Sequence, residues 1–126
     1  MKRLLIDTNV AVWLLLGDRE RVSMTAVDAL EDERNAVAVS AVSVWEIAIK
    51  RSLGKLTIPD RWAAELRRLR FDPMPVTSLH AEAVERLPRH HRDPFDRLLL
   101  AQASTEEMTI VTPDSRMRDY EVKLLW

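Results

Sequence analysis

The sequence has no cysteine and only two glycines among its 126 residues. The absence of cysteine excludes disulfide bonds, thiolate zinc sites and cysteine nucleophiles, and it suits a cytoplasmic protein. Glycine is so scarce that no glycine-rich loop of the kind that cradles nucleotide phosphates follows any apolar stretch. The sequence therefore contains no phosphate-binding loop.

Long hydrophobic runs are missing as well. The longest, residues 10–16, is far shorter than the roughly 18 apolar residues that suggest a membrane span, so we expect no membrane partner. Residues 1–6 superficially resemble a signal peptide, but Asp7 interrupts the apolar run and no small-residue cleavage site follows. We therefore expect a cytoplasmic protein that forms a single domain, residues 1–126.

The chain also lacks an excess of charge. Lys and Arg total 19 against 20 Asp and Glu, which gives a net charge of -1. Such a protein has no overall field that attracts nucleic acid, so a polyanionic partner must be bound by a local basic patch.

What the chain does contain is an alternation of apolar stretches and amphipathic helices. Residues 36–40 and most of 3–7 are apolar, which is typical of parallel strands covered on both faces. The alternation predicts a three-layer α/β/α fold with a mainly parallel central sheet. Strands are expected at residues 3–7, 36–40, 73–76, 108–112 and 122–126, and helices at 10–16, 23–35, 59–70, 78–87, 93–103 and 117–120. A longer helix is expected to begin at Ser40 or Ser43 and to run to about residue 53.

Two of the predicted strands end at an aspartate. Asp7 closes the first strand, and Asp114 follows the strand at 108–112. In open parallel sheets, ligands bind outside the carboxyl ends of the strands. Either residue alone could simply cap the next helix, but the two together favour an acidic site at this edge.

Glu46 and Asp96 are acids within predicted helices. Glu46 lies in a helix that is apolar almost all round, and a buried carboxylate must be neutralised, paired or bound to a metal. A capping box with Ser43, or an ion pair with Lys50, would also explain it. Asp96 follows a predicted N-cap, Asp93, and shares the apolar face of its helix, although an acid in the first turn also stabilises the helix dipole.

Four carboxylates are thus expected at one edge of the sheet: Asp7, Glu46, Asp96 and Asp114. Carboxylate sites without His or Cys ligands suit Mg²⁺ or Mn²⁺ better than zinc. A pair of such ions can activate water and stabilise the leaving oxygen in phosphodiester cleavage. Four neighbouring residues could support the acids by positioning them or their waters: Thr8, Asn9, Asp93 and Thr112.

The densest basic cluster, residues 89–92, directly precedes this acidic helix, and Arg97 lies one turn into it. A nuclease needs cations beside its acids to bring a polyanion close. We interpret Arg89, Arg92 and Arg97 as an RNA-binding rim. The alternative is a solvated loop whose arginines pair with Asp93 and Asp96.

These stretches resemble the successive motifs of PIN-domain ribonucleases, and more narrowly VapC-type toxins of toxin–antitoxin pairs. The resemblance covers essentially the whole chain, and the helix start at residues 93–97 is its most specific part. The other matching segments are residues 5–9, the helix around 43–50, residues 111–114 and the closing 124–126.

The resemblance implies a Mg²⁺- or Mn²⁺-dependent endoribonuclease that uses metal-activated water, with Asp7, Glu46, Asp96 and Asp114 as metal ligands. It also implies structured RNA of the tRNA or rRNA class as substrate. A VapB-like antitoxin that neutralises the toxin, and a homodimer or higher toxin–antitoxin assembly, are expected as well. In related sequences the last acid can lie a few residues later, where this chain has Met117 with Asp119 beyond; we prefer Asp114 because it follows the strand directly.

Two other functions remain open, a housekeeping RNA-processing PIN nuclease and a catalytically silent PIN-like binding module. A phosphatase of the haloacid dehalogenase type is disfavoured, because that chemistry needs a second aspartate where this chain has Asn9.

Overall fold

The computed structural model describes residues 1–89 and 93–126. Its strands form one sheet in the order β3-β2-β1-β4-β5, in which every neighbouring pair is parallel. The strands are β1 (Arg3–Ile6), β2 (Ala36–Ser40), β3 (Asp72–Met74), β4 (Thr109–Val111) and β5 (Leu124–Leu125). The helices are α1 (Thr8–Leu16), α2 (Met24–Glu31), α3 (Ala41–Ser52), α4 (Trp62–Arg68), α5 (Ser78–Ala83) and α6 (Pro94–Glu106), with 3-10 turns η1 (Arg19–Arg21), η2 (Val84–Arg86) and η3 (Ser115–Asp119).

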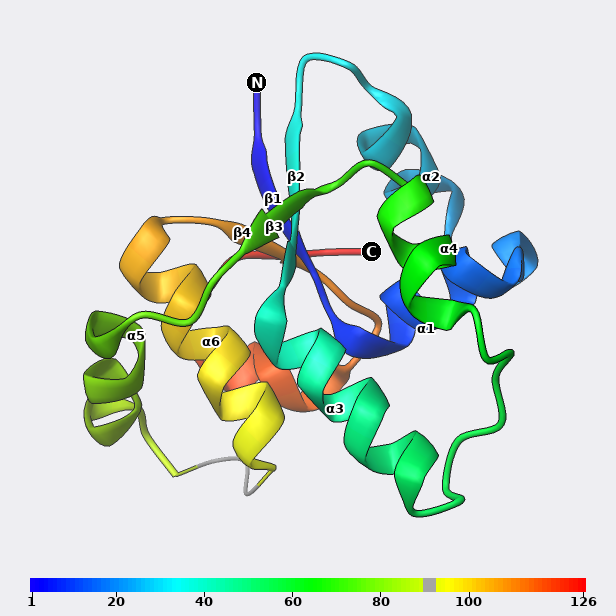
Figure 1. Ribbon diagram of the computed structural model, residues 1–126. Helices are drawn as coiled ribbons and strands as arrows, with labels where there is room; N and C mark the ends of the chain where they lie inside the picture. The colour runs from blue at the N-terminus through cyan, green and yellow to red at the C-terminus, as the bar shows by residue number, and fades with distance from the viewer. Residues whose placement is uncertain (90–92) are drawn as a thin grey trace.

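The central strand β1 has a core on each of its faces. Leu4 and Ile6 pack into one cluster with residues of α1, α2 and α4, whereas Leu5 packs into a second cluster with residues of α6. Figure 1 shows α1, α2 and α4 on one side of the strands and α5 and α6 on the other. The predicted three-layer α/β/α fold is confirmed, and the sheet is wholly parallel among the described residues. No helix in the described ranges is long and apolar enough to cross a membrane.

The start of α3 decides between two explanations of Glu46. Ser40 is the N-cap, and its hydroxyl accepts a hydrogen bond from the Val42 amide at 3.0 Å. Ser43 lies inside the helix, fully buried, and accepts a hydrogen bond from the Thr8 hydroxyl at 3.0 Å. The capping box between Ser43 and Glu46 is therefore wrong, and Glu46 needs another partner.

The remaining differences from the predicted elements are at their ends. The helix expected over 78–87 divides into α5 and η2, α4 begins later than expected, and the last strand is only two residues long. These ends carry fewer core residues, so apolar spacing defines them poorly.

Candidate active site

Asp7 is the most deeply buried of the four predicted acids that end a strand or begin a helix, at 4% exposed. It caps α1: one carboxylate oxygen accepts a hydrogen bond from the Val10 amide at 2.8 Å, and the other accepts one from the Thr112 hydroxyl. Its pKa is raised to about 6 in spite of these hydrogen bonds, mainly by burial and to a smaller extent by the charges of Asp96 and Asp114. Asp7, Asp96 and Asp114 therefore share one electrostatic environment.

Glu46 lies on α3 with its carboxylate buried. Its Oε2 accepts a hydrogen bond from Lys50 Nζ at 2.5 Å, so the predicted ion pair is confirmed. Its Oε1 is buried without a hydrogen-bond partner in the described part of the structure. A buried carboxylate oxygen without a partner is costly, and it is a candidate ligand position.

The charge of Asp96 affects the pKa values of three neighbouring groups. It adds to the raised pKa of Asp7, and with Asp93 it helps raise the pKa of Lys50 and of Arg116, for which the hydrogen bonds of Glu46 and Asp114 are the main causes. Asp96 is therefore within electrostatic range of Asp7, Lys50 and Arg116.

The start of α6 is held by Asp93, as predicted. One oxygen of Asp93 accepts hydrogen bonds from the amides of Phe95, at 2.9 Å, and Asp96, at 3.1 Å. Because Asp93 caps the helix, Asp96 is not needed as the cap. The two acids can have separate roles.

Asp114 caps η3 and pairs with Arg116, a residue that the sequence reasoning missed. The guanidinium donates from Nε and Nη2 to the two carboxylate oxygens, at 3.0 and 2.9 Å. Asp32 and Arg34, at the end of α2, form the same arrangement. The Asp-x-Arg spacing was thus a readable signal for a local ion pair, although the spacing alone does not indicate a functional site.

The other predicted residues are placed as follows. Asp119 is exposed and is not among the charges that act on Asp7. Thr8 links α1 to α3 through Ser43, and Asn9 is exposed. The structure thus brings Thr112 and Asp93 into contact with the acids or their helix, whereas Thr8 acts on α3 and not on a carboxylate.

The predicted basic rim is only partly described. Arg92 lies outside the described residues, and Arg89 is exposed. Arg97 donates to the backbone oxygens of Pro88, at 2.7 Å, and Val84, at 3.1 Å. Arg97 therefore ties the segment before α6 to its first turns, a structural role that the spacing did not reveal, and its role in RNA binding stays a prediction.

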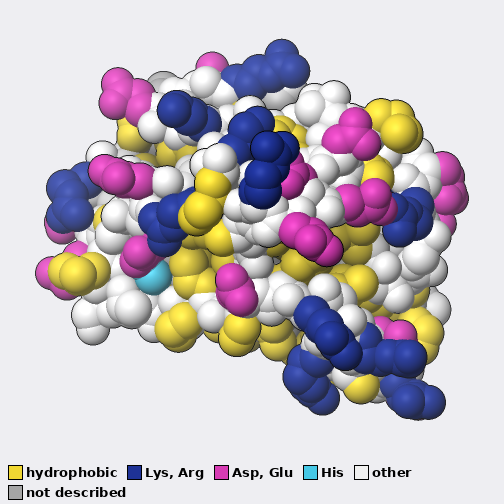
Figure 2. All heavy atoms as spheres, turned by 90° about the horizontal axis from the view of Figure 1, so that it is seen from above, with side chains coloured by type: hydrophobic (Ala, Val, Ile, Leu, Met, Phe, Trp, Pro, Cys, Tyr) yellow, Lys and Arg dark blue, Asp and Glu magenta, His cyan; other side chains and the backbone are white. Residues whose placement is uncertain are grey.

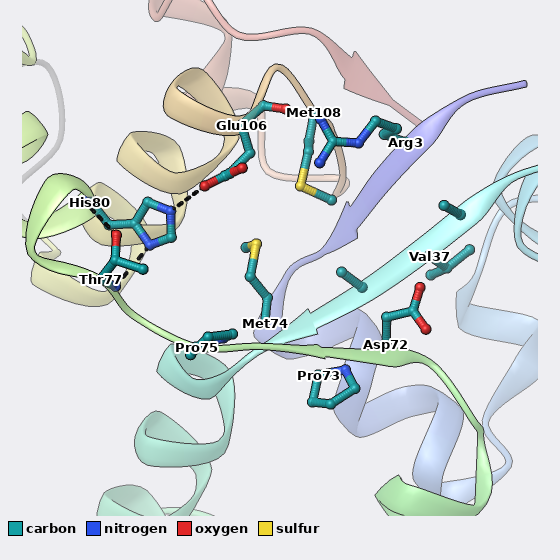
Figure 3. Close-up of a pocket in the computed structure, with 12 residues that line it drawn as sticks. Arg3, Val37, Asp72, Pro73, Met74, Pro75, Thr77, His80, Glu106 and Met108 are labelled. Atoms are coloured by element: carbon teal, nitrogen blue, oxygen red, sulfur yellow. Dashed lines mark hydrogen bonds and ion pairs between the residues drawn. The ribbon is translucent and has the colours of Figure 1, made fainter.

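A second buried polar cluster lies between α5 and α6, beside a cavity (Figure 3). His80 is 1% exposed; its Nδ1 accepts a hydrogen bond from the Thr77 amide at 3.1 Å, and its Nε2 lies 2.8 Å from Glu106 Oε1. His80 also completes a capping box with Thr77 at the start of α5. The neighbouring cavity of about 330 Å³ includes none of the four acids.

The four predicted acids offer only carboxylate oxygens to a divalent cation. Within residues 1–89 and 93–126, no three His, Asp or Glu side chains converge as a group that could hold a metal ion. The donors are nevertheless carboxylate oxygens, as Mg²⁺ and Mn²⁺ prefer, and Glu46 offers a buried oxygen without a partner. Lys50 and Arg116 partly neutralise the cluster. The carboxylate donors therefore suit such a cation. A bound ion would take the place of Lys50 and Arg116 as the positive partner of the acids.

Comparison with known proteins decides the family. A sequence profile of the PIN domain matches residues 4–123. The chain belongs to the PIN-domain family. Ribonuclease VapC22 of Mycobacterium tuberculosis is 31% identical over 127 residues, which cover 95% of this chain and 93% of that protein. The resemblance to VapC-type PIN-domain proteins is therefore confirmed.

Two solved VapBC structures contain a chain with the same fold. VapBC2 from Rickettsia felis, bound to a DNA fragment from its promoter, has a chain that matches with a TM-score of 0.74 and 16% identity, covering 97% of this chain and 96% of that one. DNA-bound VapBC from Salmonella typhimurium matches with a TM-score of 0.67 and 14% identity, over 98% and 97% of the two chains. At these identities the likeness shows the fold.

Proposed function

We propose that this PIN-domain chain is a Mg²⁺- or Mn²⁺-dependent endoribonuclease and the toxin of a toxin–antitoxin pair. The observation that carries the proposal is the electrostatic coupling of Asp7, Asp96 and Asp114 at one sheet edge, with buried Glu46 on the adjoining helix. Structured RNA of the tRNA or rRNA class is the proposed substrate. The similarity to Ribonuclease VapC22 of Mycobacterium tuberculosis supports ribonuclease activity.

The side chains of the chain itself prepare the site. Asp7 is oriented by Val10 and Thr112, and Asp96 by the cap that Asp93 forms. The four predicted acids would hold the ion, which supplies, when bound, the Lewis acidity that lets water attack a phosphodiester. In the absence of an ion, Lys50 and Arg116 compensate part of the negative charge. The protein can therefore keep these acids close together without an ion, and their remaining negative charge favours binding of a cation.

Cleavage of RNA should depend on added divalent metal. We expect activity on a tRNA or rRNA fragment to fall at least about hundredfold in excess EDTA and to return with Mn²⁺ or Mg²⁺, because the carboxylates alone provide no electrophile. The products should carry 5′-phosphate and 3′-hydroxyl ends, as mapped by end-specific ligation. Undiminished cleavage in EDTA, or 2′,3′-cyclic phosphate ends, would contradict the proposal.

We also propose a VapB-like antitoxin as the protein partner, and an apolar groove as its docking surface. The groove has a volume of about 810 Å³ and lies between α3, α4 and β3. Trp45, which is 53% exposed, lines it, and the next residue of α3 is Glu46. The Trp45 ring also contacts that of Phe95, with the ring centroids 4.9 Å apart, so this side of the groove reaches the start of α6, where Asp96 lies. Other residues that line the groove are Trp62, Leu66, Phe71 and Met74.

The charges around this groove favour an acidic helical segment. Arg67 lines the groove, and Arg61, Arg68 and Arg70 are exposed on or beside α4. In Figure 2, Lys and Arg side chains gather at the lower right, on the side where Figure 1 places α4. An amphipathic helix with acidic flanks complements both features.

A charge placed in the groove should weaken antitoxin binding. Ala48 is an exposed helical residue that lines the groove, so Ala48→Arg is expected to weaken binding of the proposed VapB-like antitoxin at least about tenfold in calorimetry. Ala81→Arg, at an exposed position of α5 outside the groove, is the matched control and should bind normally. Equal binding by the two variants would place the partner elsewhere.

Three further features stay proposals. The match of the PIN profile to residues 4–123 supports one PIN domain over residues 1–126. A homodimer, within or outside a larger toxin–antitoxin assembly, can be tested by sedimentation. A cytoplasmic location is consistent with the cysteine-free composition.

A further inference from the structure

We propose that a pocket beside the acids binds a nucleotide of the RNA strand next to the cleaved phosphodiester, with its base on Trp126 and its phosphate near Arg118. The pocket has a volume of about 410 Å³ and is lined by Thr112 and Asp114 as well as by these two residues. This proposal rests on the proposed ribonuclease function. We call this feature the Trp126 pocket.

The Trp126 pocket adjoins the acids directly. Thr112 donates a hydrogen bond to Asp7, and Asp114 raises the pKa of Asp7 through its charge. A nucleotide in the pocket would therefore contact Asp114 and Thr112, and Thr112 is hydrogen-bonded to the carboxylate of Asp7. Its volume lies within the range of about 300–1,000 Å³ typical of small-molecule sites, which is large enough for a nucleotide.

Trp126 provides a supported aromatic surface. Its ring centroid lies 6.0 Å from that of Trp13, with the planes tilted by 54°, so Trp13 holds it from one side. Trp126 is still 36% exposed, and Val122 and Leu124 extend the apolar lining. Proteins bind unpaired bases on such aromatic rings, since every base has a flat face that can stack.

Arg118 provides the positive charge that a nucleotide needs. It is exposed on η3 and forms no hydrogen bond or ion pair in the parts of the chain that the structure describes. Arg116, two residues earlier, is instead engaged by Asp114. Because Arg118 is not neutralised by an acid, it can pair with a phosphate.

The test measures binding separately from cleavage. Full-length protein in EDTA is titrated with a fluorescently labelled single-stranded RNA decanucleotide, and anisotropy gives the affinity. We expect Trp126→Leu to weaken binding about tenfold, the range given by loss of one base–aromatic stack, and Trp126→Phe to restore most of it. Arg118→Ala should weaken binding about fivefold and make it less dependent on salt.

Lys123→Ala is the matched control for Arg118→Ala, since Lys123 is an exposed cation nearby that does not line the Trp126 pocket. It should bind RNA as the wild type does. Equal affinities for Arg118→Ala and Lys123→Ala would overturn the proposal, even where Trp126→Leu fails to fold. Normal binding by a folded Trp126→Leu variant would overturn it too. The ribonuclease proposal is judged by cleavage with Mn²⁺ instead, so the two can fail independently.

Discussion

Replacing Asp96 with asparagine is expected to abolish RNA cleavage, with a loss of at least about hundredfold in kcat/KM. The charge of Asp96 acts on Asp7, Lys50 and Arg116, so Asp96 faces the same site as the other predicted acids. Asparagine preserves the shape of the side chain and leaves the cap formed by Asp93 intact. We expect the free energy of unfolding of the metal-free variant to equal or exceed that of the wild type.

Asp119→Asn is the control for this change. Asp119 is exposed at the end of η3 and does not act on Asp7, so cleavage should be unaffected. The competing explanation is that Asp96 only complements the dipole of α6. Residual cleavage by Asp96→Asn together with a stability loss of more than about 1 kcal/mol in urea denaturation would favour that explanation.

The predictions from sequence succeeded where one strong local signal acts alone. The apolar run that ends at Asp7 specified β1, and the pair Asp93 and Pro94 specified the start of α6. Parallel strands have their carboxyl ends at one edge, which is why Asp7 and Asp114 could be grouped; that these acids form a catalytic site with Glu46 and Asp96 stays a prediction. Ion-pair spacing on a helix likewise identified Lys50 as the partner of Glu46.

The predictions fell short where two local solutions were nearly equal or where a distant contact decides. Ser40 and Ser43 are both good caps, and burial of Ser43 against Thr8 settled the choice. The burial of His80 depends on a tertiary contact, because its Nε2 meets the Glu106 carboxylate at the far end of α6. Arg97 points to backbone oxygens whose position no spacing encodes. Such tertiary partners are invisible in a single sequence.

Replacing Asp7 with asparagine should stabilise the metal-free protein at neutral pH. The pKa of Asp7 is raised to about 6 in the folded state from an ordinary value of 3.8, mainly by burial. Between these pH values the folded state binds more protons than the unfolded state, so the contribution of Asp7 to stability is full below about pH 4 and is lost as the pH rises through about 6. Ionised Asp7 therefore costs the fold about 2–3 kcal/mol above pH 7.

Asparagine cannot ionise, yet it caps helices as well as aspartate does. Urea denaturation in EDTA should therefore show Asp7→Asn and wild type nearly equal near pH 4, with the variant about 2 kcal/mol more stable at pH 7.5. The exposed Asp119→Asn should show no such divergence. A stability difference that stays constant across this pH range would mean that the altered hydrogen bond to Thr112, and not the buried charge, is responsible. Added Mn²⁺ should narrow the gap at pH 7.5, because a cation that binds the Asp7 carboxylate stabilises the wild type more than the variant.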